Sequence, residues 1–252
     1  MKPMIIKSFV VSLLSIFVMG LVRITFKTDL YLSDIGGLGV FVTAFGTLYG
    51  IMAAFVVFEV WSQFNKASEL VDLEGQGLER LFRLTLYCRD KKLEEEMKAA
   101  IKTYANGVIA DKFQALGTGQ HNVVNGINFR KIAKVITDIK FDDDHDAIVY
   151  GQILEHYGHL GMVRTNRINQ SIQRMPVLLK VFLYSSSAFA LLTFVFMPFA
   201  NMYYGFLATG FLGFILAMIF NLVEDLDNPF VGHWNITSEP FERALKHIEE
   251  DY

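Results

Sequence analysis

The residues best suited to chemistry are three carboxylates at the end of the most apolar part of the chain. Glu224, Asp225 and Asp227 follow residues 181–223, which contain no Asp, Glu, Lys or Arg. Because carboxylates oppose the dipole at the C-terminal end of a helix, we expect each to have a partner. One interpretation is pairing with Lys or Arg of the cytoplasmic helices or of a neighbouring subunit. The other is a cation site, with Ca²⁺ as the candidate ion, or a charged ring at a pore mouth.

A fourth carboxylate, Glu59, stands where a second apolar stretch, residues 35–58, ends. Repeated around the axis of an oligomer, Glu59 would form a ring that favours cations. The alternative is a side chain at the membrane interface that faces water or an arginine.

Three arginines recur at intervals of three and seven, which places Arg164, Arg167 and Arg174 on one helix face. They could contact anionic lipid headgroups or attract anions. The alternative is ion pairing with acids that precede them in the chain: Glu69, Glu74 and Glu79.

Two histidines and an acid, Glu155, His156 and His159, are metal-ligating residue types. Their Glu-His-x-x-His order is not the His-Glu-x-x-His of zinc peptidases, so we expect structural or surface histidines. Aspartates at 142–146 lack the Gly and the distal Glu of a calcium loop and are predicted to cap a helix.

Other chemistry is excluded or not indicated. The single Cys88 excludes an intrachain disulfide and a multi-cysteine metal site. The sequence contains no Gly-rich phosphate loop, nucleophile elbow or pair of catalytic carboxylates, so we predict no enzyme and, apart from Ca²⁺, no cofactor. No basic cluster of the kind that binds nucleic acid is present.

Four apolar stretches must position these residues. The composition is 52% hydrophobic and only 19% charged, and about 20 apolar residues cross a bilayer as a helix. Residues 5–26 and 35–58 each provide one span, and residues 181–223 provide two, with a turn at 200–205. The sequence therefore predicts an all-α integral membrane protein with four transmembrane helices.

The second span contains the candidate pore-lining residues. Phe41, Phe45 and Tyr49 share one face at intervals of four and could form a hydrophobic constriction, as could Phe55. The alternative for these aromatic residues is packing against lipid or another span. Gly46 and Gly50 are also four apart. One interpretation is close approach of another helix, and the other is that they line a conduit or act as its hinge.

The middle of the chain predicts a helical domain outside the membrane. No stop signal follows residue 58, so the second helix should continue beyond the membrane. An amphipathic helix follows the charged break at 89–92, with its apolar face at Leu93, Met97, Ile101, Tyr104 and Val108. The predicted division is 1–61 for spans one and two, 62–176 for the helical domain, 177–226 for the hairpin of spans three and four, and 227–252 for a C-terminal tail.

The positive residues set the predicted orientation. Arg164, Arg167, Arg174 and Lys180 lie close to the third span, so the positive-inside rule places the helical domain and both termini in the cytoplasm.

Three stretches resemble a known family. They are GTLYGIMAAFVVFEVWSQFNKASELVDLEGQGLERLFRL at 46–84, EDLDNPFVGHWNIT at 224–237 and, more weakly, TYANGVIADKF at 103–113. With the four-span layout, they resemble the bestrophin-like membrane proteins, and most closely a bacterial family with a bestrophin-like domain. The resemblance implies an oligomer, pentameric in true bestrophins, with span two lining a pore for small anions or, in some bacterial members, cations. The acids here precede Pro229, unlike the calcium clasp of true bestrophins, so calcium gating is not implied.

Together with these observations, the resemblance implies an oligomeric ion channel of a bacterial inner membrane, whose partners are the lipid bilayer, copies of the chain and small inorganic ions, with no nucleic acid. The alternative is a non-conducting membrane scaffold or sensor that recruits a partner through its cytoplasmic helices. A membrane-embedded enzyme is a third, weaker alternative.

Overall fold

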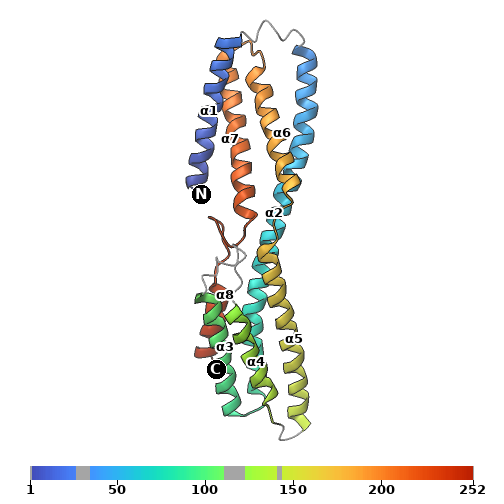
Figure 1. The fold of residues 1–252 in the computed structure, drawn as a ribbon, viewed down its shortest axis with the longest axis vertical. Helices are drawn as coiled ribbons and strands as arrows, with labels where there is room; N and C mark the ends of the chain where they lie inside the picture. Colours follow the sequence, from blue (N-terminus) through green and yellow to red (C-terminus); the bar gives the residue numbers. More distant parts are fainter. Residues whose placement is uncertain (1, 27–34, 111–122, 141–143, 252) are drawn as a thin grey trace. The chain divides into compact units, whose positions relative to one another are not determined.

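The structure is a computed structural model that describes residues 2–26, 35–110, 123–140 and 144–251 (Figure 1). All regular elements in these ranges are helices, which confirms the all-α prediction for the described residues. The helices are α1 Lys2–Phe26, α2 Ile35–Leu86, α3 Lys91–Ala110, α4 Val123–Thr137, α5 Asp144–Ile172, α6 Val177–Phe196, α7 Met202–Leu226 and α8 Glu239–Glu250. Residues 117–122, whose composition predicts a loop, lie outside the described residues, as do Asp142 and Asp143 of the predicted cap.

The chain forms two compact units. Unit 1 comprises residues 1–62 and 174–227, and unit 2 comprises residues 63–173 and 228–252. Helix α2 contributes to both, because it is continuous over 52 residues. This continuity confirms the prediction that the second helix runs on beyond residue 58, where the sequence contains no helix-breaking residue.

Unit 1 is held together by close packing of small residues between α1 and α7. A Cβ atom at Gly210 would lie 2.7 Å from Cδ1 of Ile16, and one at Gly213 would lie 2.6 Å from Oγ of Ser15. The Ser12 hydroxyl donates to the Gly210 carbonyl at 2.7 Å. Small residues let helix backbones approach, and hydroxyl groups then bond across the gap.

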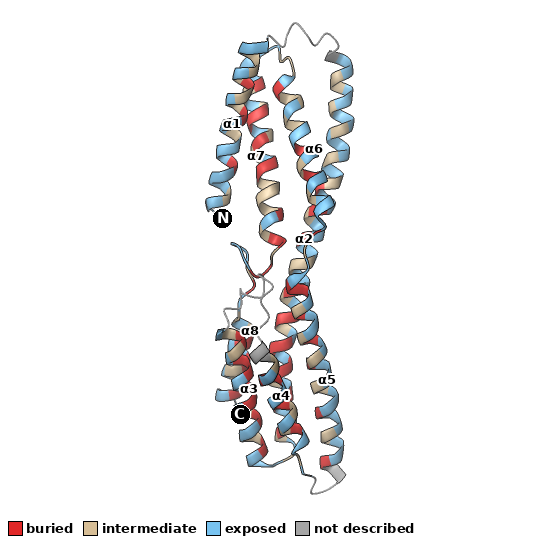
Figure 2. Ribbon diagram, viewed as in Figure 1, coloured by how far each residue is buried: buried red, intermediate tan, exposed pale blue. Residues whose placement is uncertain are grey.

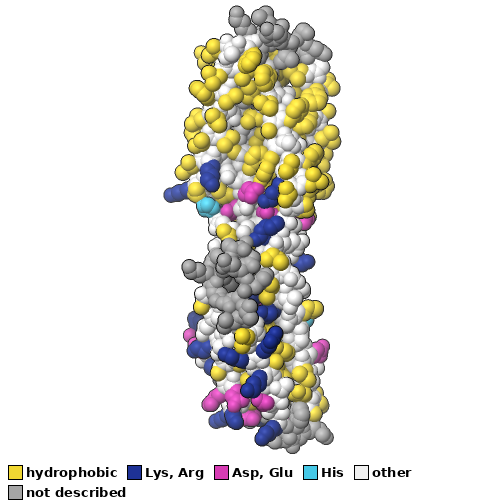
Figure 3. Space-filling model, viewed as in Figure 1, with side chains coloured by type: hydrophobic (Ala, Val, Ile, Leu, Met, Phe, Trp, Pro, Cys, Tyr) yellow, Lys and Arg dark blue, Asp and Glu magenta, His cyan; other side chains and the backbone are white. Residues whose placement is uncertain are grey.

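The surface of unit 1 is apolar. Large hydrophobic side chains such as Phe17 (62% exposed) and Ile24 (77% exposed) project from α1, and yellow side chains cover this unit in the view of Figure 3. Figure 2 shows that burial in this unit is concentrated on α7, whereas most of α1 is exposed or intermediate. In the described part of the chain, four helical stretches have the length and composition to cross a membrane: Lys2–Phe26, parts of Gly36–Leu86 and Asp146–Phe196, and Met202–Leu226.

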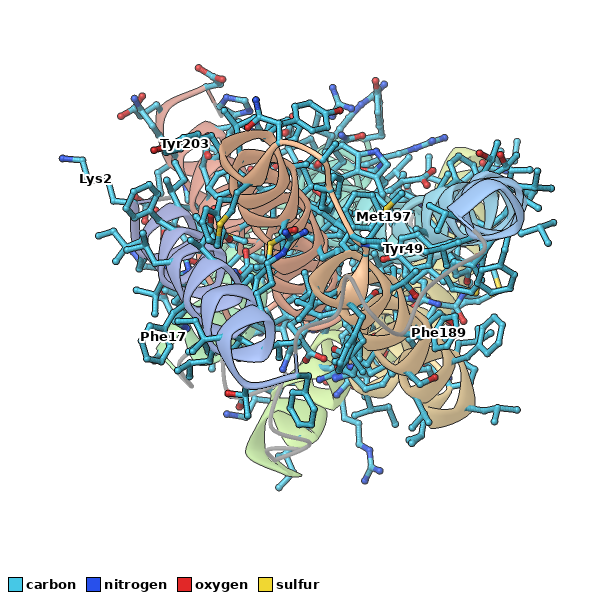
Figure 4. The ribbon with its side chains drawn as sticks, turned by 90° about the horizontal axis from the view of Figure 1, so that it is seen from above. Lys2, Phe17, Tyr49, Phe189, Met197 and Tyr203 are labelled. Atoms are coloured by element: carbon cyan, nitrogen blue, oxygen red, sulfur yellow. The ribbon has the colours of Figure 1, made fainter. Side chains whose placement is uncertain are left out.

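The hairpin between α6 and α7 turns slightly earlier than predicted. Helix α6 ends at Phe196, and the Asn201 side chain caps α7 by accepting from the N–H groups of Tyr203 and Tyr204 at 3.0 and 3.3 Å. Asparagine caps in this way because its oxygen satisfies N–H groups that have no helical partner. Tyr203, at 87% exposure, therefore lies in the first turn of α7 and not in the connecting turn (Figure 4).

Unit 2 has a hydrophobic core of its own. The predicted apolar face of α3 is confirmed, because Leu93, Met97, Ile101, Tyr104 and Val108 are all buried. All of these except Leu93 pack in one cluster with residues of the C-terminal part of α2, of α4, α5 and α8, and with Phe230.

Helix α8 closes this core, with Ser238 at the N-cap position and Pro240 in the first turn. The Ser238 hydroxyl does not accept from the helix backbone and bonds the Glu242 carboxylate at 2.8 Å. Buried Phe241, Ala244 and Ile248 anchor the helix instead.

Candidate functional site

The acidic cluster after residue 223 lies in unit 1, between the end of α7 and the start of α6. Lys180 Nζ lies 3.3 Å from Glu224 Oε2 and 2.8 Å from Asp227 Oδ2. Asp227 Oδ1 also accepts the backbone N–H of Met175 at 2.6 Å, and the Tyr184 hydroxyl donates to Glu224. Two of the three acids are therefore paired with a lysine, and Asp225 also has an interaction partner.

This arrangement fits an ion-paired cluster better than a calcium site. Ca²⁺ requires about six to eight oxygen ligands, whereas the carboxylate oxygens here face an ammonium group, a phenol and a backbone N–H. Across the described residues, no three His, Cys, Asp or Glu side chains are grouped so that they could hold a metal ion. Lys180 would have to leave Asp227 before a cation could bind.

One face of α2 in unit 1 packs against α6. The ring centroids of Phe41 and Phe45 lie 6.0 and 5.2 Å from that of Phe189, and the Tyr49 hydroxyl is 2.6 Å from the Ser187 hydroxyl. Figure 4 labels Tyr49 on α2 and Phe189 on α6. These contacts account for the three aromatic residues by packing between spans, and their place in a pore constriction stays a prediction.

A second face of α2 is open. A Cβ atom at Gly39, Gly46 or Gly50 would have nothing within 4 Å. Thr43 and Thr47 are exposed, and their hydroxyls bond back to carbonyls one turn earlier, at 2.9 and 2.8 Å. Since successive residues turn by about 100°, Thr47 lies on the opposite side of the helix from Phe45. The face formed by these glycines and threonines carries no charge, and the described residues of its own chain do not pack against it.

The other two candidates on α2 are exposed. Phe55 is 70% exposed. Glu59 is also exposed, but it takes part in an interaction and is not solitary. Val56, which follows Phe55, is 5% exposed, and Val60, which follows Glu59, is fully buried, so the buried side of the helix continues past these two residues.

Of the three arginines, Arg167 has the pairing predicted for the group. Its Nε lies 2.5 Å from Glu74 Oε2, its Nη2 donates to Glu74 Oε1 at 3.4 Å, and both side chains are buried in unit 2. The Tyr104 hydroxyl donates to the same carboxylate, and the Arg167 guanidinium lies 5.7 Å from the Phe241 ring centroid. The cluster therefore ties together α2, α3, α5 and α8.

Arg164 and Glu79 do not form the predicted arginine–acid pairs, so the prediction is wrong for these two residues. Arg164 lies over the Phe129 ring, 5.3 Å from its centroid. Glu79 contacts Arg83 at 4.0 Å and His247 at 3.1 Å. Helix α8, whose packing onto α2 the sequence did not indicate, brings the histidine to Glu79.

Burial and charge fix the protonation states in this buried cluster. Burial raises the pKa of Tyr104, and the charge of Glu74 raises it further, so the phenol stays neutral. Burial alone would lower the pKa of Arg167, but the neighbouring Glu74 outweighs it and the pKa rises. The cluster is a charged pair supported by a neutral hydrogen-bond donor.

Comparison with known proteins identifies the fold family. A sequence model described as the bestrophin-like domain matches residues 9–241. The chain belongs to the bestrophin-like family. None of the curated protein sequences matches it.

Solved structures agree with this bestrophin-like assignment at the level of the fold. A point variant of a bacterial bestrophin homologue from Klebsiella pneumoniae superposes with a TM-score of 0.73 at 14% identity, covering 97% of this chain and 99% of that one. A second structure of a homologue from that organism, phased with zinc, gives 0.68 at 13% identity, with 98% and 96% covered. A further structure, described as a membrane protein, gives 0.73 at 13% identity, with 97% and 99% covered.

Three residues of the stretch at 224–237, which carried part of the family resemblance, make structural contacts in this bestrophin-like chain. Asp227 holds Lys180 and the Met175 N–H in unit 1. Phe230 is fully buried in the core of unit 2, and the Pro229 carbonyl accepts from the Ile236 N–H at 2.8 Å. The motif thus terminates α7 and begins the segment that leads to α8.

Two partners of the acidic cluster were missed from the sequence. Lys180 and Tyr184 are four residues apart on α6, so one helix face presents both to Glu224. A lysine and a tyrosine one turn apart at the start of an apolar span were the available signal.

Proposed function

We propose that this bestrophin-like chain is a subunit of an oligomeric ion channel in the bacterial inner membrane, and that the unit 1 part of α2 lines the pore. Family membership supports the class of protein. The bestrophin-like fold is that of a membrane protein, and the four apolar helical stretches supply the spans. The proposal includes the predicted orientation, with both termini and unit 2 in the cytoplasm, and a passive channel in place of an enzyme.

The observation that carries the proposal is the open face of α2. A helix that only met lipid would gain from large apolar side chains over its whole outer surface. Gly46 and Gly50 instead leave the backbone bare, and Thr43 and Thr47 present hydroxyls. Such a face suits either a neighbouring subunit at close range or a water-filled path.

The contacts of α2 decide which of its two faces we assign to the pore. Phe41, Phe45 and Tyr49 hold the helix against α6, so the glycine and threonine face is the one we assign to the ion path. The aromatic residues then stand behind the lining face and set the position of the helix. Glu59, at the end of this segment, is assigned to the pore mouth, where a carboxylate ring favours cations.

Reconstituted flux with cysteine probes tests both the channel and the face. The chain has one cysteine, Cys88, so Cys88→Ser provides a background for Thr47→Cys and for its matched control, Phe45→Cys. We expect ion flux above empty vesicles, and block by a charged thiol reagent in Thr47→Cys but not in Phe45→Cys. Glu59→Gln should shift the reversal potential away from cation preference.

Three outcomes would count against the proposal. Block in Phe45→Cys alone would return the aromatic face to the pore. Flux that neither cysteine affects would remove α2 from the path. Absence of flux, with a cytoplasmic protein retained by the purified chain, would favour the scaffold.

A further inference from the structure

Unit 2 contains a cavity that none of the features above uses. It has a volume of about 310 Å³ and lies between the unit 2 part of α2 and α5. Its lining comprises Leu73, Gln76, Gly77, Arg80 and Leu84 from α2, and Gln152, Glu155, His156, His159 and Leu160 from α5. A volume of this size accepts a small metabolite.

Close packing at Gly77 shapes the floor of the cavity. A Cβ atom there would lie 2.7 Å from Cδ1 of Leu160, so a larger residue at this position would require the end of the Leu160 side chain to move. The His156 ring fixes the same point, because its Nε2 lies 3.0 Å from the Gly77 carbonyl oxygen. The floor is therefore formed by two rigid helices and not by a loop.

The walls carry two opposite charges that are not paired with each other. In the part of the chain that the structure describes, neither Arg80 nor Glu155 forms an ion pair. Nearby acids of α2 are occupied elsewhere, since Glu79 contacts Arg83 and His247 while Asp72 binds Arg243.

The histidines do not make this a metal site. His156 Nε2 is engaged with a carbonyl oxygen, and the His156 and His159 rings are stacked with centroids 6.4 Å apart. Burial lowers the pKa of His156, the hydrogen bond with the Gly77 carbonyl opposes this shift, and the charge of Arg80 adds to it. Arg80 and Glu155 supply the two opposite charges of the lining.

We propose that this cavity binds a small zwitterion, a free amino acid, with its carboxylate on Arg80 and its ammonium group on Glu155. A simple anion would meet the negative charge of Glu155, and a simple cation would meet Arg80. A ligand that carries both charges satisfies both walls. The guanidinium presents donors in a planar fork that matches a carboxylate, and the amides of Gln76 and Gln152 supply further hydrogen bonds. Leu73 and Leu84 leave room for an apolar side chain.

Calorimetry on the purified full chain tests the class of ligand. The probes are the L-α-amino acids, with N-acetyl amino acids lacking the ammonium charge, amino-acid amides lacking the carboxylate, and inorganic phosphate as a simple anion. We expect at least one amino acid to bind, and its acetyl and amide derivatives to bind about tenfold more weakly or worse, because each loses one charge-assisted contact.

Two variants that each remove one charge, together with a matched control, test which residues of the cavity bind the ligand. Arg80→Gln and Glu155→Gln should each weaken binding of the amino acid by about tenfold or more. Arg83→Gln, on the same helix but outside the cavity, should leave binding unchanged. Both variant sites are exposed, so folding should be preserved, and an unchanged melting temperature checks this.

Other results would overturn the proposal. If no amino acid binds at millimolar concentration, the cavity has no such ligand. If phosphate binds and Glu155→Gln strengthens it, the cavity is an anion site. If an amino acid binds equally well to Arg80→Gln and Glu155→Gln, it binds elsewhere in the chain.

Discussion

The two units each contain an ion-paired cluster, and the clusters differ in burial. In unit 2, the side chains of Arg167 and Glu74 are 3% and 0% exposed. In unit 1, Lys180 is 21% exposed, and its partners Glu224 and Asp227 are 54% and 5% exposed. The second cluster thus joins one buried and one exposed acid to the same lysine.

The difference in burial determines how much each ion pair contributes to the stability of its unit. A buried charge that loses its partner cannot be solvated by water, so breaking such a pair is strongly destabilising. An exposed charge keeps its water and loses little. The Glu74 cluster should therefore govern the stability of unit 2, whereas in unit 1 the effect should depend on which acid is changed.

The largest expected effect is that of Arg167→Met. The substitution leaves the Glu74 carboxylate buried without its cation, which should lower the free energy of unfolding by about 3–5 kcal/mol. Denaturant or thermal unfolding of the purified full chain measures it.

A double variant separates the ion pair from its context. Adding Glu74→Leu to Arg167→Met removes the stranded charge and should recover a substantial part of the lost stability. A single Arg167→Met variant that unfolds like the wild type would show that the pair is not buried in solution.

Tyr104→Phe comes next in size. It removes the hydroxyl that donates to Glu74, while the ring and its packing remain. Loss of a hydrogen bond to a buried charged group should lower stability by about 1.5–3 kcal/mol. Tyr157→Phe is the matched control, since the Tyr157 hydroxyl is only half-buried and donates at 3.3 Å to a neutral carbonyl, that of Phe129. An equal loss in both variants would contradict a special role for Tyr104.

The elements were predictable because they depend on local pattern. The spans follow from long uncharged stretches, the continuity of α2 from the absence of Pro or Gly in residues 59–74, and the buried face of α3 from its spacing. The α1–α7 contact was not predicted, because Gly210 and Gly213 indicate that some helix approaches closely without indicating which one.

The sequence predicted the residues of the candidate site better than it predicted the contacts that they make. The sequence indicated that Glu224 and Asp227 need partners, but the choice of Lys180 depends on the start of α6 lying beside the end of α7. Likewise, the four-residue spacing placed Phe41, Phe45 and Tyr49 on one face, but periodicity cannot say whether that face meets α6 or a pore. Tertiary packing decides both.

Asp227→Asn should have the larger effect of the two acids in unit 1. The amide can still accept from the Met175 N–H through its oxygen, but the charge opposite Lys180 is lost at a position that is 5% exposed. We expect a loss of about 1–3 kcal/mol. Asp227→Ala, which also removes the acceptor for Met175, should lose more, and unfolding of both variants under one condition compares them. Equal losses would show that the backbone contact contributes nothing.

Glu224→Gln should have the smallest effect. Comparing it with Asp227→Asn tests whether burial sets the strength of the ion pairs within one cluster. Glu224 is 54% exposed, and the amide oxygen of glutamine can still accept from the Tyr184 hydroxyl. Because water screens the lost charge, we expect a change of at most about 1 kcal/mol, and less at high salt. Double-mutant cycles with Lys180→Met measure the coupling of the lysine to each acid, and the coupling to Asp227 should exceed that to Glu224. If the order is reversed, exposure does not decide the strength of these pairs, and the contrast between the two units must come from geometry.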